Sequence, residues 1–216
     1  MLTDGDVERV AASAAALPAA EAVYTEDDFI KNLFETVLDY MLRTPVVVKA
    51  LEYYTANHWD EIRTLGDLRQ TLSRYPDTQA GNTKLATHLW GYKLWTRAHQ
   101  LRDLVAYFES VGVVDQTSLR AWAHRSEYKR DFQGRVRGLG RAVHESLVMR
   151  QGVDTVKPDV HVRRFAEAAV GRPLSDEDVI SVVRAAAQSL GLRASELDWR
   201  IWEAGQRGAL SPTRVD

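Results

Sequence analysis

Apolar residues recur at intervals of three or four positions along most of the chain, which is the spacing of one face of an α-helix. The clearest case covers residues 29–41, where seven apolar side chains keep that interval: Phe29, Ile30, Leu33, Phe34, Val37, Leu38 and Met41. The same spacing predicts helices over residues 45–57, 82–90, 95–111, 119–123, 127–133, 142–150 and 160–170. Short β-branched runs at 46–48 and 179–183 fall inside helical patterns. We therefore expect an all-α protein.

Polar residues that cap helices stand at several expected helix starts. A Ser or Thr followed three residues later by an acidic side chain resembles a capping box, in which each side chain bonds the other residue's backbone N–H. Four such pairs occur: Thr25 with Asp28, Thr64 with Asp67, Ser175 with Asp178, and Ser195 with Asp198. Thr44 followed by Pro45 is typical of an N-cap and a first helical residue.

Composition excludes several kinds of chemistry. The chain of 216 residues has no cysteine, which excludes disulfides, thiolate zinc sites, cysteine-ligated iron–sulfur clusters and cysteine nucleophiles. The histidines show no metal-ligand spacing. No apolar run is long enough to span a bilayer, and Asp4, Asp6 and Glu8 stand where a secretory signal would carry positive charge. We expect a cytoplasmic protein with no metal and no membrane role.

Charge is distributed unevenly, although the formal net charge is only −2. Residues 125–164 contain ten basic and five acidic side chains, and this local excess of five positive charges leaves −7 on the remainder. For a protein that contacts phosphates, the distribution of charge matters more than its total. We therefore expect the residues that bind phosphate to lie in this basic stretch.

Two glycines lie inside this basic stretch, between the helices expected at 127–133 and 142–150. The candidate DNA-binding residues surround them: Arg135, Arg137, Gly138, Leu139, Gly140 and Arg141. Glycine on both sides of an apolar residue lets the backbone turn sharply, and exposed N–H groups at the start of the next helix suit a phosphate oxygen. Taken alone, however, a Gly-x-Gly segment more often just ends one helix and begins another.

Asp159 follows 21 positions after Gly138, at the start of the helix expected over residues 160–170. An aspartate at a helix start is ordinarily an N-cap, because its side chain accepts from the first N–H groups of the helix. The capping role and a catalytic role are compatible in one carboxylate.

Together these segments resemble the helix-hairpin-helix (HhH-GPD) DNA glycosylase superfamily, in its endonuclease III and MutY branch. In that superfamily the hairpin has the approximate pattern L-P-G-V-G-x-K-T-A, and a later aspartate segment has the pattern V-D-T-H-V-x-R. The two hairpin glycines match the first pattern, and Asp159, His161, Val162 and Arg164 match the second. Weaker similarity extends in the expected order over residues 25–171.

The resemblance implies a two-lobed helical fold with a cleft between the lobes. Residues 25–150 would form a helical, barrel-like lobe that ends in the helix-hairpin-helix. Residues 1–24 and 151–216 would form a second helical lobe that carries the aspartate segment. Double-stranded DNA would be the partner, a target nucleotide would swing out of the duplex, and Asp159 would be the catalytic carboxylate.

The resemblance also indicates which residues would meet the displaced nucleotide. Some family members fill the gap in the duplex with a glutamine, and the matching place here is near Met41, which could wedge but could not hydrogen-bond to the orphan base. Aromatic rings stack well on bases. The base-pocket or wedge candidates are Tyr40, Met41, Trp90, Tyr92 and Trp95. For Trp90 and Trp95, core packing at a helix junction is the commoner role.

Departures from the family pattern narrow the expected chemistry. Bifunctional members carry a Schiff-base lysine two residues after the second hairpin glycine, where this chain has Ala142. Arg137 replaces the family's proline before the first hairpin glycine. The resemblance thus implies a monofunctional glycosylase that uses water as nucleophile and needs no cofactor, with room for a monovalent cation at the hairpin. The excised base and the oligomeric state stay open.

Two other interpretations fit the same residues. A non-catalytic helix-hairpin-helix DNA-binding protein would use the hairpin but would need Asp159 only as an N-cap. A helical protein-interaction scaffold, suggested by the six tryptophans and the acidic remainder, would have no DNA affinity. DNA binding separates the scaffold from the other two, and base release separates the enzyme from the binding module.

Overall fold

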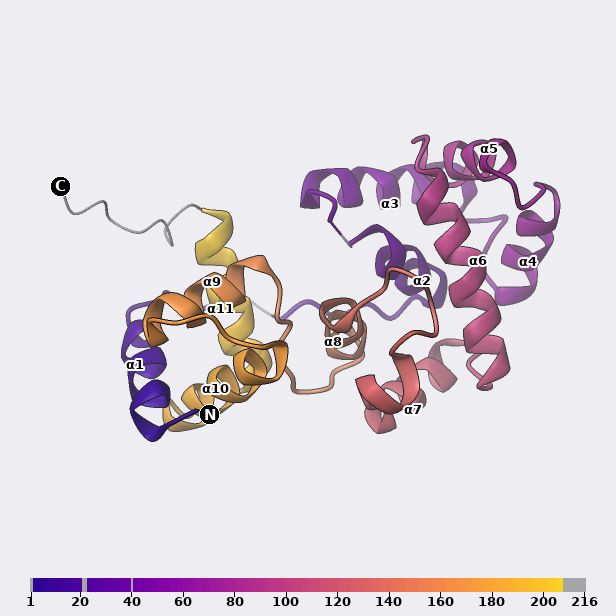
Figure 1. The fold of residues 1–216 in the computed structure, drawn as a ribbon. Coiled ribbons are helices and arrows are strands. Elements are labelled where there is room, and N and C mark those ends of the chain that lie inside the picture. Colours follow the sequence, from indigo (N-terminus) through magenta and orange to yellow (C-terminus); the bar gives the residue numbers. More distant parts are fainter. Residues whose placement is uncertain (1, 21–22, 40, 208–216) are drawn as a thin grey trace. The chain divides into compact units, whose positions relative to one another are not determined.

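The computed structural model describes residues 2–20, 23–39 and 41–207. This part of the chain consists of helices and turns without a β-strand, which confirms the all-α prediction (Figure 1). Its α-helices are α1 (Asp4–Ala15), α2 (Phe29–Leu38), α3 (Thr44–His58), α4 (Leu65–Ser73), α5 (Gln79–Trp90), α6 (Trp95–Ser110), α7 (Gln116–Arg125), α8 (Arg141–Arg150), α9 (Val160–Val170), α10 (Asp176–Ser189) and α11 (Ala194–Gln206). None of these described helices is long and apolar enough to cross a membrane.

The chain divides into two compact units. The first contains Met1–Thr25 and Gly152–Asp216, and the second contains Glu26–Gln151. These two boundaries lie one residue after the predicted ones, which followed residues 24 and 150. The hairpin belongs to the second unit and Asp159 to the first, so each candidate region is built by its own unit.

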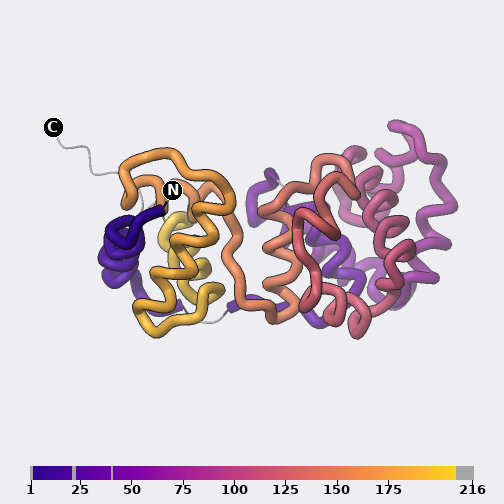
Figure 2. The backbone as a smooth tube through the Cα atoms, turned by 60° about the horizontal axis from the view of Figure 1, so that its bottom comes forward, coloured from indigo at the N-terminus to yellow at the C-terminus, as the bar shows by residue number. Residues whose placement is uncertain are grey.

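The first unit joins the beginning of the chain to its last three helices. Val10 and Ala14 of α1 are buried in one core with Val162 of α9, Val183 of α10 and Leu197 of α11. In Figure 2 the indigo helix α1 lies beside orange and yellow segments, in agreement with its packing against α9 and α10. The first helix therefore completes a core whose other members come from the end of the chain.

The second unit is centred on a cluster of aromatic rings. Phe34 of α2 meets Tyr54 of α3 and Trp90 of α5 edge to face, at centroid distances of 4.9 and 5.5 Å. This arrangement is the one that the ring quadrupoles favour. The Tyr54 hydroxyl donates to the Ile62 carbonyl at 2.6 Å, so this buried polar group is satisfied. The cluster fixes the relative positions of α2, α3 and α5.

A buried polar network ties the end of α8 to α2. Arg150 is 3% exposed, and its guanidinium donates to Thr36 Oγ1 at 2.7 Å and to Asn32 Oδ1 at 3.2 Å. Gln151 Nε2 also donates to Asn32 Oδ1 at 2.9 Å, and Gln151 Oε1 accepts from Nε2 of Gln116 on α7 at 2.8 Å. Arg150 is therefore a structural cation, and its place in the basic stretch says nothing about binding.

Two of the expected capping pairs act at the predicted helix starts. Thr64 and Asp67 form a complete capping box at the start of α4. Ser175 is the N-cap of α10, and its side chain accepts from the Asp178 amide at 3.1 Å. In both cases the residues that satisfy the helix end lie within the same turn, so the local sequence is sufficient.

Two other expected helix starts are wrong in detail. Thr25 is not the N-cap of α2, because Asp28 takes that role and accepts from the Lys31 amide at 2.7 Å. Thr44 is the first residue of α3 rather than its N-cap, and the N-cap Arg43 makes no side-chain cap bond. Both helices exist as predicted, but their first residues differ.

Candidate nucleic-acid interface and the Asp159 segment

The glycine hairpin connects a short π-helix, Tyr128–Phe132, to α8. The sequence predicted a helix over residues 127–133, and the structure has a single π-helical turn of five residues there. Val136 and Leu139 are 1% and 3% exposed, and they anchor the hairpin in the core. Between them Gly138 has a φ of +86°, a backbone conformation that residues other than glycine rarely adopt. The hairpin is thus fixed by two apolar anchors and a left-handed glycine.

The start of α8 has no side-chain cap. Its N-cap is Gly140, which has no side chain to satisfy the first N–H groups. Those groups have no partner within the helix, and the helix dipole makes this end positive. A Cβ atom built on Gly140 would meet nothing within 4 Å, so a ligand atom can approach the backbone closely. This end of α8 has the geometry and the electrostatics of an anion site.

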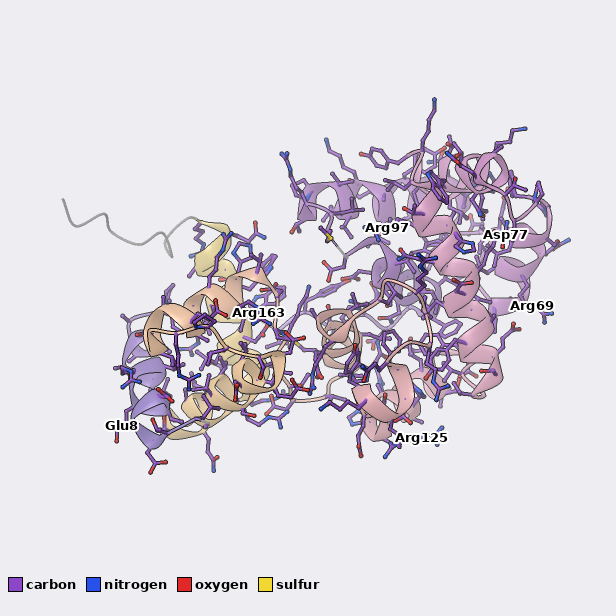
Figure 3. All side chains as sticks on the ribbon, in the orientation of Figure 1. Glu8, Arg69, Asp77, Arg97, Arg125 and Arg163 are labelled. Carbon is purple, nitrogen blue, oxygen red and sulfur yellow. The ribbon has the colours of Figure 1, made fainter. Side chains whose placement is uncertain are left out.

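Two residues of α6 hold the tip of the hairpin. Gln100 Nε2 donates to the carbonyl of Arg137 at 3.0 Å. Arg97 Nη1 donates in turn to Gln100 Oε1 at 2.9 Å. Figure 3 marks Arg97 on α6. Nothing in the local sequence of the hairpin predicted this contact, because its donors come from a helix that ends well before the hairpin begins.

The cations of the basic stretch have different environments. Arg135 and Arg137 in the hairpin are exposed, as is Arg125 at the end of α7 (Figure 3). Arg130 is paired with Glu127 at 2.9 Å and with Asp131 at 2.8 Å. The local excess of positive charge counted in the sequence is therefore larger than the charge that the hairpin surface can offer to a ligand.

Arg141, the first residue of α8, is held more firmly than the hairpin arginines. Its Nε lies 3.3 Å from Glu145 Oε1, one helical turn later. Its guanidinium carbon also lies 5.5 Å from the centre of the Tyr128 ring, within the range of a cation–π contact. Arg141 is half-buried, so the structure places it as the inner cation of the hairpin and Arg135 and Arg137 as the outer ones.

The structure separates the five pocket and wedge candidates. Trp90 is fully buried, which corrects its assignment as a base-pocket candidate: it packs in the aromatic cluster of the second unit. Trp95 is 38% exposed at the start of α6, and Tyr92 is half-buried. Met41 is 82% exposed. Tyr40 lies outside the described residues.

Met41 follows α2 and does not belong to it. The apolar spacing predicted a helix up to Met41, whereas α2 ends at Leu38. Met41 has a φ of 57°, and among the described residues it is the only one other than glycine with a positive φ. Such a conformation stores about 1–3 kcal/mol of strain. An exposed apolar side chain on a strained backbone is unusual, and it makes Met41 the most distinctive of the candidates.

Asp159 is the N-cap of α9, as its place before the expected helix indicated. Its Oδ1 accepts from the amides of His161 at 2.9 Å and Val162 at 3.1 Å. Within the described part of the chain Oδ2 has no hydrogen-bond partner. The residue is half-buried. One oxygen thus caps the helix, and the second remains for another contact.

The loop that leads to Asp159 is fastened to the start of α11. Asp154 accepts from the Ser195 amide at 2.9 Å and from the Ser195 hydroxyl at 2.8 Å. Asp198, 3% exposed, accepts from the amide of Lys157 at 2.7 Å. These bonds overturn the predicted capping box of Ser195 and Asp198, because α11 begins at Ala194 and Asp154 satisfies its first amides. The side chains of Asp154 and Asp198 therefore position the segment that contains Asp159.

Hydrogen bonding also changes the acidity of Asp154. Burial by itself would raise the pKa of this carboxyl, but the bonds from the Ser195 amide, the Ser195 hydroxyl and the Ala194 amide outweigh it and hold the pKa below its ordinary value. The carboxylate is therefore charged at neutral pH. A charged acceptor at this helix start makes the attachment of the loop stronger than a neutral one would.

His161, the second residue of α9, packs against Gly205 of α11. A Cβ atom at Gly205 would come within 2.4 Å of His161 Nδ1, so only glycine allows this approach. The contact gives His161 a supporting role beside Asp159. Among the described residues, no group of three or more His, Asp or Glu side chains is placed to hold a metal ion.

Two half-buried histidines of the second unit form a pair that the sequence did not indicate. The rings of His58 on α3 and His88 on α5 lie 4.2 Å apart between centroids. Both nitrogens of His58 and Nε2 of His88 are buried without a hydrogen-bond partner in the described structure. Burial, followed by the proximity of His58, lowers the pKa of His88. The two residues are far apart in the sequence and share no spacing pattern that could have revealed the pair.

Comparison with known proteins places most of the chain in a family that has no assigned function. Residues 47–206 match a family described as a domain of unknown function (DUF8548), and the chain belongs to that family. The matched region includes the hairpin and Asp159 but begins after Met41. No curated protein and no solved structure matches the chain.

Proposed function

We propose that this protein is a monofunctional DNA glycosylase, which removes a damaged or modified base by hydrolysis of its N-glycosidic bond. The observation that carries the proposal is the start of α8, where the N-cap Gly140 has no side chain to cap the helix and the exposed Arg135 and Arg137 precede it in the hairpin. The similarity of the hairpin and aspartate segments to the helix-hairpin-helix glycosylases supplies the expected activity.

The hairpin would bind the phosphate backbone of duplex DNA. Backbone amides at a helix start can donate to a phosphate oxygen whatever the DNA sequence, so this contact positions the protein on DNA without specifying a base. The exposed side chains of Arg135 and Arg137 would neutralise neighbouring phosphates. Release of the counterions condensed on those phosphates would make the affinity fall as the salt concentration rises.

Met41, Tyr92 and Trp95 are the candidates for contact with the distorted duplex. The exposure of Met41 supports its use as a wedge, because proteins that kink DNA insert apolar side chains between base steps. Exposed aromatic surface on Trp95 supports stacking with an unpaired base. The proposal needs none of the buried rings, and Trp90 has no part in it.

Asp159 would act on the sugar of the displaced nucleotide. As the bond from C1′ to the base breaks, its electron pair leaves with the base and positive charge develops on the sugar. The open Oδ2 of Asp159 could stabilise that charge or take the proton from an attacking water. Water forms the new bond to C1′ and gives up a proton, and the departed base, which took the electron pair, gains one, so that the protons balance. Since Ala142 replaces the lyase lysine, the product is an intact abasic strand.

A non-catalytic DNA-binding role is the second candidate, and one observation favours it. Asp159 already caps α9 through Oδ1, so the need for a helix cap is by itself enough to explain an aspartate here. Such a protein would keep the hairpin contact and its salt dependence, but it would release no base. Binding measurements therefore do not separate the two candidates, whereas a chemical assay does.

The test is a screen of duplexes that carry alkylated, deaminated, oxidised or hypermodified bases. Each duplex is incubated with the protein and then treated with alkali, which breaks the strand wherever a base has been removed. The proposal expects alkali-dependent strand breaks at one class of modified base. Binding to these duplexes without release from any of them would support the non-catalytic role instead.

A further inference from the structure

We infer that Gln100 is a positioning residue of the hairpin, which it holds in the form that binds a DNA phosphate. The inference rests on the proposed DNA contact and adds to it a residue on a different helix. Gln100 lies on α6, and its side-chain amide reaches the carbonyl of Arg137 at 3.0 Å across 37 positions of sequence. Its role would be to order the hairpin before DNA arrives.

The neighbouring arginine fixes the orientation of the Gln100 amide. A guanidinium only donates hydrogen bonds, so Arg97 Nη1 must face the amide oxygen, and the structure has it there at 2.9 Å. The NH₂ group of the same amide must then face the Arg137 carbonyl, which only accepts. Both ends of the amide are satisfied in one orientation alone. Arg97 and Gln100 therefore form a defined chain of donors from α6 to the hairpin.

The bond is made at the part of the hairpin that the core does not hold. Val136 and Leu139 are buried, but Arg137 and Gly138 between them are exposed. An exposed loop tip is mobile unless another contact restrains it. Because the Arg137 carbonyl belongs to the peptide bond that leads into Gly138, a restraint on it limits rotation at the left-handed glycine. We call this hydrogen bond from Gln100 to the Arg137 carbonyl the tether. It acts on the residues that lead into the start of α8.

Loss of the tether should weaken binding without removing a phosphate contact. A hairpin that samples several conformations must be ordered when DNA binds, and that ordering lowers the affinity. If the tether is worth about as much as one typical hydrogen bond, its loss should weaken DNA binding about fivefold to tenfold. The slope of affinity against salt should not change, because the number of neutralised phosphates stays the same.

The experiment compares Gln100→Met with Gln70→Ala in the full chain. Methionine has a similar length and no charge but cannot donate to the Arg137 carbonyl, and Gln70 is an exposed glutamine on α4 of the same unit. Binding to a labelled duplex is titrated at several salt concentrations. We expect Gln100→Met to bind about fivefold to tenfold more weakly with an unchanged salt slope, and Gln70→Ala to bind like wild type.

Hydrogen exchange of the Leu139 amide gives a second readout that needs no DNA. This amide donates to the Val136 carbonyl at 3.2 Å across the hairpin, so a looser tip should make it exchange faster in Gln100→Met at an unchanged melting temperature. If wild type does not bind DNA, the proposed function is wrong. The exchange rates would still test whether Gln100 orders the hairpin. Unchanged exchange, or unchanged affinity in a protein that binds DNA, would overturn it.

Discussion

Gly138 and Gln100 lie close together: a Cβ atom at position 138 would be 2.6 Å from Nε2 of Gln100, so a side chain there would push the end of the Gln100 side chain away. The same glycine has a φ of +86°. Glycine is thus favoured at this position for two reasons: its own backbone conformation, and the position of the Gln100 amide, which a side chain would displace. The Gly-x-Gly pattern of the sequence indicated the first reason, and only the structure reveals the second.

Gly138→Ala should lower the free energy of unfolding by about 1–3 kcal/mol, from backbone strain and from contact with Gln100. In a Gln100→Ala background the contact disappears, so the loss should be smaller by about 1 kcal/mol. Urea unfolding of the four proteins measures this coupling. Gly112→Ala is the control, because its φ is +76° and its Cβ would meet nothing within 4 Å. Equal losses from Gly138→Ala in both backgrounds would show that the contact is not restrictive.

Substitutions of Gly140 separate folding from phosphate binding. This residue has an extended backbone with room for a side chain, and both Asn and Asp are good N-caps, so each variant should keep the stability of wild type within a few tenths of a kcal/mol. Asp places a negative charge where the phosphate would bind. Gly140→Asp should therefore bind DNA about tenfold more weakly than Gly140→Asn in a fluorescence anisotropy titration. Similar affinities would place the DNA elsewhere.

Asp198 should matter for stability through its bond to the Lys157 amide. Asp198→Ala leaves that N–H group unpaired in a buried site, which should reduce the free energy of unfolding by about 1–3 kcal/mol. Asp198→Asn keeps an oxygen acceptor in the same place and should lose clearly less. Chemical denaturation of the two variants provides the comparison. A loss as large in the Asn variant would mean that the charge, and not the acceptor, fixes the loop.

His88 should make stability depend on pH. Because burial beside His58 lowers the pKa of His88 in the folded protein, the unfolded chain takes up a proton at higher pH than the folded one. The stabilisation is complete above the ordinary histidine pKa of about 6.5, and it is lost as the pH falls through the lower folded pKa. Melting temperatures measured from pH 7.5 down to pH 5 should fall more in wild type than in His88→Gln. Parallel curves would show that His88 does not titrate in this way.

Local sequence predicted the helices well and their connections less well. Thr64 and Asp67 satisfy one helix end from within its own turn, so their spacing was sufficient evidence. The start of α11 is satisfied by Asp154, which lies about 40 residues earlier, and no local pattern can encode such a partner. Ser195 and Asp198 have the spacing of a capping pair, but they bond instead to Asp154 and to the Lys157 amide, in the loop that leads to Asp159.

The candidate site also combines features set by local sequence with features set by residues distant in the sequence. Its backbone features, the left-handed Gly138 and the N-cap Asp159, follow from residue type and helix position, and the sequence indicated both. The burial of Arg150 and Trp90 and the tether from Gln100 depend on packing between helices distant in sequence. The charge of residues 125–164 therefore exceeds the positive charge at their surface, because it includes the buried structural Arg150 as well as the exposed arginines.

The most direct test of the proposed glycosylase compares wild type with Asp159→Asn under single-turnover conditions, on a duplex whose modified base the wild type releases. Asparagine keeps most of the capping ability, so melting temperature and DNA affinity should not change. Base release should fall by roughly a hundredfold or more, because the charge on the carboxylate is lost, and the wild-type product should be an abasic strand that breaks only after alkali. Equal rates of base release in the two proteins would contradict the catalytic role of Asp159.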